Sequence, residues 1–277
     1  MANEISDTEL LATQQDLISS IVLETLKQKA FLIPTVRQVQ VAGGQKSVAI
    51  PRRTQLSPED KLENTALTAQ EITFATDILN LDKKKAIYSK IEEIPELQAN
   101  VGVEAELVRE MAEELALQVD RDLISCLALA SAAGPDHQID PFAAGKVSLE
   151  DFTEAGKLLD LQSVPRGDRF ALMSPVEYKD LLDEDKITSV DRFGVREPIN
   201  EAEVGQLFNF RIMVHNEVAA GDVFFYHKNH CAYAQQLGAT FKQDQDLSND
   251  AREFLMKMVY GVKDLDSGKR GVKLTIV

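Results

Sequence analysis

The chain has 277 residues, 44% of them hydrophobic, and a formal net charge of −15. It is long enough to bury one large core or two small ones, while its acidity argues against a protein that binds nucleic acid or anionic membranes, because phosphate binding requires a positive field. Aromatic residues make up 6% and tryptophan is absent, which disfavours stacking on bases as an activity.

The sequence carries no recognisable targeting signal, membrane span or disulfide pattern. The segment MANEISDTELL lacks the basic and apolar regions of a signal peptide. No apolar run approaches the roughly 20 residues of a membrane span. The two cysteines, Cys126 and Cys231, form neither a disulfide framework nor a zinc-ligand spacing, which fits a reducing cytosol.

The N-terminal part combines a helix with β-rich pieces. Apolar residues recur at helical spacing between residues 8 and 29, which predicts an amphipathic helix that packs on its own domain or on a neighbour. Two short β-rich pieces then flank Gly43 and Gly44, a hairpin-turn signal. The sequence GGQKS in this turn lacks the glycine spacing of a phosphate loop and precedes a strand instead of a helix, so no nucleotide site is expected.

A two-stranded arm is predicted over residues 48–91. Its tip, TQLSPEDKLENTALTAQ, is polar, and the returning EITFATDILNLDKKKAIYSKI alternates as an extended strand. An isolated two-stranded ribbon is marginally stable in water, so we expect the arm to rest on another subunit; the alternative is a solvated hairpin within a monomer. The charged residues expected to contact a neighbour are Arg52, Arg53, Glu59, Asp60, Lys61 and Glu63.

A long amphipathic helix is predicted over residues 96–130, ending before Gly134 and Pro135. At about 1.5 Å per residue it would span roughly 50 Å. Its apolar stripe consists of Val101, Ala105, Val108, Ala112, Leu115, Val119, Leu123 and Cys126. Its acidic residues Glu110, Glu113 and Glu114 are expected to face solvent, because the helix contains no histidine to complete a metal site.

The segment SLEDFTEAGKLLDLQSVPRGDRFALMSPVEYKDLL predicts a helix, a sharp bend, a buried strand and a second helix. Ser148 with Asp151 forms a capping box, Pro165 ends the first helix, and Ser174 with Pro175 begins the second. The remaining residues read mostly as strands, in VGQLFNFRIMVHNEV, GDVFFYHKNHCAYAQQL and GVKLTIV, with mixed helix and strand signals in SNDAREFLMKMVYGVKDLD.

Groups able to perform catalysis are few. His227 and His230 are expected on opposite faces of a strand, since their separation is odd, and no second cluster completes a metal site with Cys231. Arg166 and Arg169 at the bend could hold an anion, but salt bridges to the neighbouring acids Asp160 and Asp168 explain the pattern as well. We therefore expect no catalytic residue, no cofactor and no metal.

The order of these elements resembles a tailed-bacteriophage major capsid protein of the Hong Kong 97-type fold over residues 35–277. The stretch AGKLLDLQSVPRGDRFALMSPVEYKDLL resembles the helix, turn and strand of the family's axial domain, and GQLFNFRIMVHNEV the continuation of that domain's sheet. The stretch TALTAQEITFATDILNLDKKKAIYSKI resembles the returning strand of the family's extended loop. None of these pieces is a catalytic signature.

The resemblance implies an α+β fold in four parts. They are an N-terminal arm (residues 1–35), an extended β-hairpin loop (residues 48–89), a peripheral domain with a long spine helix (residues 36–47, 90–147 and 236–277) and an axial domain (residues 148–235).

The resemblance also implies a structural function and not an enzymatic one. The chain would be a coat protein that assembles with itself, through hexamers and pentamers, into an icosahedral shell enclosing double-stranded DNA. Its implied partners are a portal protein, DNA bound without sequence specificity and, as an option, a cement protein, with no membrane. It would reside in the virion capsid and, before assembly, in the host cytoplasm. Because the hairpin begins within about forty residues of the start, a separate scaffolding protein is expected instead of a cleavable N-terminal segment.

Two other functions stay open. A cellular nanocompartment shell, similar to an encapsulin, would share the fold but enclose a cargo enzyme. A small oligomeric enzyme with an anion site at Arg166 and Arg169 would form a particle of only tens of kilodaltons.

Overall fold

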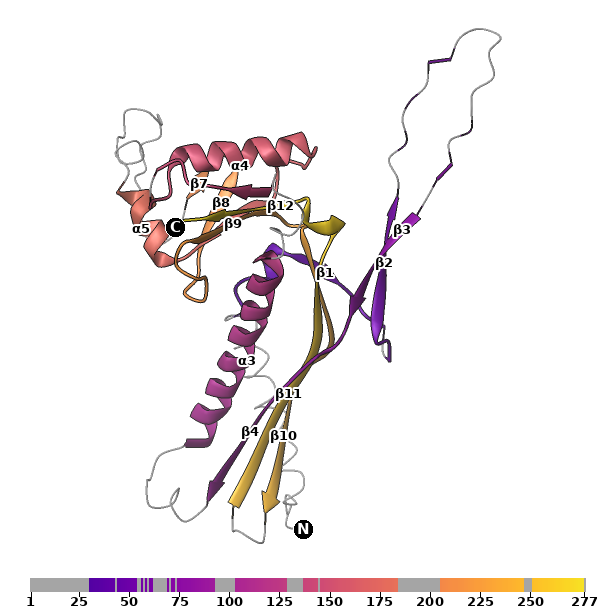
Figure 1. The fold of residues 1–277 in the computed structure, drawn as a ribbon. Helices are drawn as coiled ribbons and strands as arrows, with labels where there is room; N and C mark the ends of the chain where they lie inside the picture. Colours follow the sequence, from indigo (N-terminus) through magenta and orange to yellow (C-terminus); the bar gives the residue numbers. More distant parts are fainter. Residues whose placement is uncertain are drawn as a thin grey trace, which may run out of the picture.

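Figure 1 shows the computed structural model of the chain, an elongated molecule with two sheets, a long helix and a projecting ribbon. The structure describes residues 30–42, 44–53, 74–92, 103–128, 137–143, 145–183, 205–246 and 251–276, and the single positions 56, 58, 60, 61, 69, 71 and 72. The helix expected over residues 8–29 lies outside the described residues.

A four-stranded sheet with a long helix on one face forms the lower part of the molecule in Figure 1. Its strands run in the order β1 (Arg37–Val39), β10 (Cys231–Asp246), β11 (Ala251–Asp264) and β4 (Lys83–Glu92). Strand β1 is parallel to β10, and the other neighbours are antiparallel. Helix α3 (Val103–Ala128) packs against this sheet.

The apolar stripe predicted for α3 forms the core between the helix and the sheet. Its described members are buried, and they share one core cluster with Phe254, Met256, Met258 and Tyr260 of β11. The acids Glu110, Glu113 and Glu114 are exposed, as predicted. The 26 residues described as helix span about 39 Å, while residues 93–102 and 129–136 lie outside the described residues.

A six-stranded sheet forms the second half of the fold. Its order is β5 (Gln138–Ile139), β12 (Gly271–Thr275), β9 (Asp222–His227), β6 (Arg169–Met173), β8 (Phe210–Val214) and β7 (Gln206–Leu207). Helix α4 (Leu149–Leu161) lies over this sheet, and α5 (Pro175–Leu182) follows β6. Phe152 of α4 packs edge-on against Phe210 and Phe225 at the centre of a second core cluster.

The helix–bend–strand–helix unit follows the prediction from its sequence. The Asp151 carboxylate accepts the Ser148 N–H at 2.7 Å and the Phe142 N–H at 3.0 Å, so this aspartate caps α4 where a glutamate is usual. Helix α4 ends before Pro165, and all five residues of β6 are buried. Ser174 caps α5 by accepting the Val176 N–H at 3.2 Å. Each boundary is fixed locally, which explains why the sequence predicted it.

The predicted two-stranded arm over residues 48–91 is wrong only in its last part, residues 83–91. Strand β2 (Ser47–Arg53) pairs with β3 (Phe74–Asn80) as a ribbon, but the chain beyond it forms β4, which pairs with β11. The cause is a close packing at the base of the ribbon, where a Cβ on Gly261 would lie 2.1 Å from the Asn80 carbonyl oxygen. Only glycine lets the two backbones approach this closely, so the chain is held against the sheet and continues as its edge strand.

The segment before the ribbon is fixed by a buried carboxylate on α3. A short 3-10 helix, η1 (Ile33–Thr35), leads into β1. The backbone N–H groups of Phe31 and Leu32 both donate to the Asp120 carboxylate at 3.2 Å.

Among the described residues, no helix is long and apolar enough to cross a membrane. The division of the chain into arm, loop, peripheral and axial domains at the boundaries given above stays a prediction.

Candidate functional site

The arginines at the bend between α4 and β6 are bound by their own chain. The Arg169 side chain, 2% exposed, donates to the Val164 carbonyl at 2.7 Å, the Pro165 carbonyl at 2.9 Å and the Asp160 carboxylate at 2.5 Å. Arg166 donates to the other Asp160 oxygen at 2.8 Å. Hydrogen bonds from Arg169, and then from Arg166, hold the pKa of Asp160 below its usual value. Arg169 would have to break these hydrogen bonds to bind an anion, so its side chain stabilises the bend and is not free to bind a ligand.

The prediction that His227 and His230 lie on opposite faces of one strand is wrong. His227 is the last residue of β9, and His230 lies in the turn before β10. The Nδ1 atom of His227 accepts the Asn229 N–H at 3.1 Å. Burial lowers the pKa of His230 to about 4, so its ring is neutral at pH 7. Across the part of the chain that the structure describes, no group of three His, Cys, Asp or Glu side chains could hold a metal ion.

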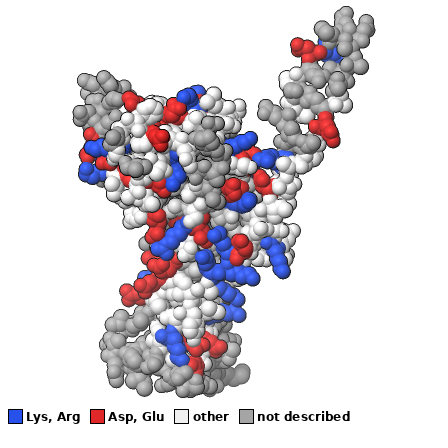
Figure 2. All heavy atoms as spheres, in the orientation of Figure 1, with Lys and Arg blue, Asp and Glu red and all other residues white. Residues whose placement is uncertain are grey.

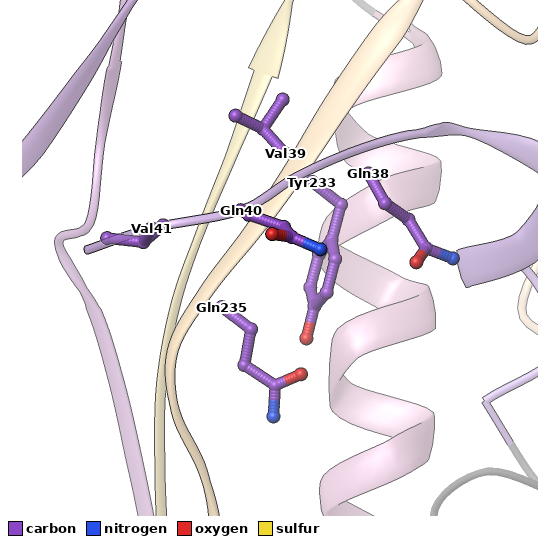
Figure 3. A pocket seen from close by; sticks show the side chains of 6 residues that line it. All are labelled: Gln38, Val39, Gln40, Val41, Tyr233 and Gln235. Carbon is purple, nitrogen blue, oxygen red and sulfur yellow. The ribbon is translucent and has the colours of Figure 1, made fainter. Parts of the chain in front are cut away.

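A small hollow beside β1 and β10 is lined by amides and one phenol. Figure 3 shows Tyr233 and Gln235 of β10 facing it together with the segment that continues β1, and its volume is about 330 Å³. The lining residues are Gln38, Val39, Gln40, Val41, Tyr233 and Gln235. Burial raises the pKa of Tyr233 far above its usual value. None of these groups exchanges a proton near pH 7, so the hollow lacks an acid or base for catalysis.

A second, shallower hollow lies between α4 and the segment of β5. It has a volume of about 480 Å³, and its lining includes Phe142, Asp140 and Lys157. The Lys157 ammonium is paired with Glu154 at 2.7 Å. Both members of this ion pair lie on α4.

The described residues that were predicted to contact neighbouring subunits lie at the end of β2 and in the tip beyond it. Arg52, which pairs with Ala75 at the end of the strand pair that leads to the tip, forms an ion pair with Asp266 of the same chain, and this hydrogen bond raises the pKa of Arg52. Arg53 ends β2. Asp60 and Lys61 are exposed toward the far tip. Glu59 and Glu63 lie outside the described residues, so the predicted intersubunit contacts remain predictions.

Large apolar side chains on the ribbon face solvent. Phe74 is 64% exposed and Ile78 is 55% exposed, and both lie on the same face of β3 because their separation is even. Ile72, just before the strand, is 50% exposed. Figure 1 shows that the ribbon projects away from the two sheets. In the described parts of the chain, nothing covers this apolar face.

The outer face of α3 is acidic, whereas the outer face of its sheet carries lysines together with the acids Asp244 and Glu253. Glu106, Glu110, Glu113 and Glu114 are exposed along α3. The strand register places three lysines together on the sheet face that points away from α3: Lys84, Lys242 and Lys257. Figure 2 shows acidic side chains along the helix and basic ones over the sheet. The net charge of the sequence does not reveal this distribution of charged side chains, because the distribution depends on the pairing of strands distant in the chain.

Sequence reasoning missed the contacts that join the parts of the fold. Asp120 accepts the two N–H groups of residues 31 and 32, and its Oδ2 lies 3.4 Å from the His215 Nε2. The next residue, Arg121, forms a bidentate ion pair with Glu217, with hydrogen bonds of 2.8 and 3.0 Å. The pattern of charges along α3 did not predict these contacts, because the partners of Asp120 and Arg121 lie outside this helix.

The model of a protein family described as Phage capsid protein matches residues 94–273, well over half of the chain. No curated protein matches the chain.

Solved structures with the same arrangement come from several sources. The capsid structure of the cyanophage P-SCSP1u has a TM-score of 0.73 and 17% identity, covering 87% of this chain and 86% of that one. Mycobacterium phage Che8 has a TM-score of 0.65 and 20% identity, covering 83% and 84%. A virus-like particle from Pyrococcus furiosus has a TM-score of 0.63 and 13% identity, covering 94% and 99%. These likenesses confirm the expected fold, a mixed helix-and-sheet capsid fold of the Hong Kong 97 type.

Proposed function

The chain belongs to the phage capsid protein family, and we propose that it assembles through hexamers and pentamers into an icosahedral shell around double-stranded DNA. It is a structural shell protein of the virion capsid and associates with copies of itself. The observation that supports the finer proposal is the projecting ribbon, whose apolar face the rest of the described chain leaves open.

Burial of that face on a neighbour would contribute substantially to assembly. A fully buried Phe or Ile side chain contributes roughly 1.5–3 kcal/mol relative to an exposed one. Phe74 and Ile78 are both more than half exposed, so the pair offers about 3 kcal/mol per ribbon. A shell contains one ribbon per subunit, and these modest contributions add up over the closed surface.

The paired strands of the ribbon and its tip then have different roles. The ion pair between Arg52 and Asp266 fixes the ribbon to its own subunit. Asp60 and Lys61, together with Glu59 and Glu63, would form polar contacts at the rim of the neighbouring subunit. The same proposal holds for Arg53.

The remaining partners follow from the proposed shell. A separate scaffolding protein would direct assembly in the host cytoplasm, a portal protein would occupy one vertex, and a cement protein could bind outside. The packaged DNA would be held without sequence-specific contacts. The acidic outer face of α3 is suited to line the interior, because its charge repels DNA and lets the DNA slide. We propose that the protein has no enzymatic activity.

The second candidate is a nanocompartment shell. Its support is the likeness to a structure described as a virus-like particle from Pyrococcus furiosus, in a match that covers 94% of this chain. The two candidates differ in what the particle encloses. The match to the phage family model makes the phage capsid the first choice.

The test is assembly of the purified protein, with any co-expressed scaffolding protein, followed by sedimentation and negative-stain microscopy. Closed shells of uniform diameter support the proposal, and their nucleic-acid or protein content separates the two candidates. A double variant, Phe74→Ser with Ile78→Ser, should keep the far-ultraviolet circular dichroism of the wild type and fail to assemble. Ala75→Ser, on the opposite face of β3, is the matched control and should assemble normally. A wild-type chain that stays a monomer or dimer under all conditions would overturn the proposal.

A further inference from the structure

Two buried thiols lie in contact between α3 and the four-stranded sheet. The Sγ atoms of Cys126, on α3, and Cys231, the first residue of β10, are 3.0 Å apart, although the residues are 105 positions apart in the chain. Cys126 is 6% exposed and Cys231 is fully buried, and both belong to the main core cluster. Both are free thiols in this structure. The shell function makes no use of this pair.

We propose that Cys126 and Cys231 are a modification site at which a small-molecule disulfide, such as glutathione disulfide, generates an intramolecular bond between α3 and β10. The two sulfurs already touch with no atom between them. They would need to approach by only about 1 Å to reach the length of a disulfide bond.

The reaction is thiol–disulfide exchange in two steps. The thiolate of one cysteine attacks a sulfur of glutathione disulfide, forms a mixed disulfide and releases one glutathione thiolate, which takes up a proton. The second cysteine then attacks the protein sulfur of the mixed disulfide and releases the second glutathione. Two electrons pass from the cysteine pair to the glutathione disulfide, so one disulfide is formed and one is reduced.

The packing of the core sets the rate of the reaction. Burial, and then the hydrogen bond with Cys126, raises the pKa of Cys231 well above its usual value, so the reactive thiolate is scarce in the closed fold. Glutathione disulfide is also too large to enter a close-packed core. Exchange therefore proceeds when α3 lifts from the sheet. A reducing cytosol keeps the thiols free, and an oxidising exterior lets the bond accumulate.

The position of the bond determines its effect. The turn at residues 228–230 links β9 of the six-stranded sheet to β10 of the four-stranded sheet, and Cys231 follows directly. A bond from here to Cys126 would fasten the C-terminal part of α3 to the junction of the two sheets. It would also close a long loop in the unfolded chain, which lowers the entropy of that state. We expect the midpoint of thermal unfolding to rise by about 5–10 °C.

The test uses the full chain, incubated with excess glutathione disulfide near the onset of thermal unfolding and then cooled. The expected result is a mass decrease of about 2 Da under denaturing, non-reducing conditions, corresponding to two lost hydrogens. Peptide mapping should link the Cys126 peptide to the Cys231 peptide of one chain. The thermal midpoint should rise and should return when dithiothreitol is added.

The wild type before and after oxidation is its own comparison, so the result does not depend on a variant that folds. Cys126→Ala and Cys231→Ala serve as added controls and should gain no stability from oxidation. Glutathione adducts without a linked peptide, links only between different chains, or free thiols after the full treatment would each overturn the proposal. The bond would form within one chain, so these outcomes are independent of whether the protein forms shells.

Discussion

Replacement of Asp120 by alanine should loosen the segment that enters the fold before β1. The Asp120 side chain is fully buried on α3 and accepts the N–H groups of Phe31 and Leu32, each at 3.2 Å. Its Oδ2 also lies 3.4 Å from the Nε2 of His215. The change to alanine removes the acceptor for all three groups at once.

The expected loss of stability follows from these contacts. A buried donor without a partner costs about 1–3 kcal/mol, and the variant leaves the N–H groups of Phe31 and Leu32 without their acceptor. The variant is also relieved of the desolvation penalty of the carboxylate, which offsets part of this loss. We expect the free energy of unfolding to fall by about 2–4 kcal/mol for Asp120→Ala. Asp120→Asn, which keeps one acceptor oxygen, should lose roughly half as much.

The assay is urea unfolding of the unassembled subunit, followed by circular dichroism. The midpoint should shift to lower urea while the slope stays constant, because the surface exposed on unfolding is unchanged. Glu110→Ala, an exposed position on the same helix, controls for helix propensity and should stay within about 0.5 kcal/mol of the wild type. Equal midpoints for Asp120→Ala and Glu110→Ala would refute the reasoning.

Three further predictions concern single positions. Arg169→Ala should lower the free energy of unfolding by about 3–5 kcal/mol, because it breaks a buried charge-assisted network. Since the pKa of Asp160 is held low, its ion pair stabilises the fold above about pH 4, and this stabilisation is lost as the pH falls through the lowered pKa. The difference in unfolding free energy between variant and wild type should therefore narrow in urea titrations at pH 3. Gly261→Ala should cost about 3 kcal/mol in the same titration and expose the base of the ribbon to proteolysis, because the new Cβ would lie 2.1 Å from the Asn80 carbonyl oxygen. Tyr233→Phe should leave the free energy of unfolding unchanged or raise it by up to about 1 kcal/mol, because the buried hydroxyl has no hydrogen-bond partner among the described residues.

Each of these variants has a matched control. Arg166→Ala removes a mostly exposed arginine from the same aspartate and should cost less than about 1 kcal/mol. Gly167→Ala places its Cβ in open space and should be tolerated. Tyr226→Phe loses a hydroxyl bonded to Thr35 at 2.8 Å and should cost about 1 kcal/mol. A Tyr233→Phe variant less stable than Tyr226→Phe would show that the Tyr233 hydroxyl has a partner in solution.

The elements that the sequence predicted well are those fixed by neighbours in the chain. The stripe from Val108 to Cys126 repeats at helical spacing, and α3 buries these residues as expected. The capping residues Ser148 and Ser174 and the position of Pro165 set the ends of α4 and α5. These signals act over three to five residues, so the unfolded chain already carries them.

The tertiary structure alone decided which distant segments meet. Strand β4 alternates as well as any strand of an isolated ribbon, and only its partner β11, with Gly261 at the ribbon base, places it in the four-stranded sheet. The ion pair of Arg52 with Asp266 joins residues 214 positions apart, and the contact between Cys126 and Cys231 joins residues 105 positions apart. The charges of Lys84, Lys242 and Lys257 gather on one face through the same strand pairing. A local pattern fixes the type and faces of an element. Its partner depends on the packing of the whole core, because the pairing that forms is the one in which many distant contacts together give the lowest free energy.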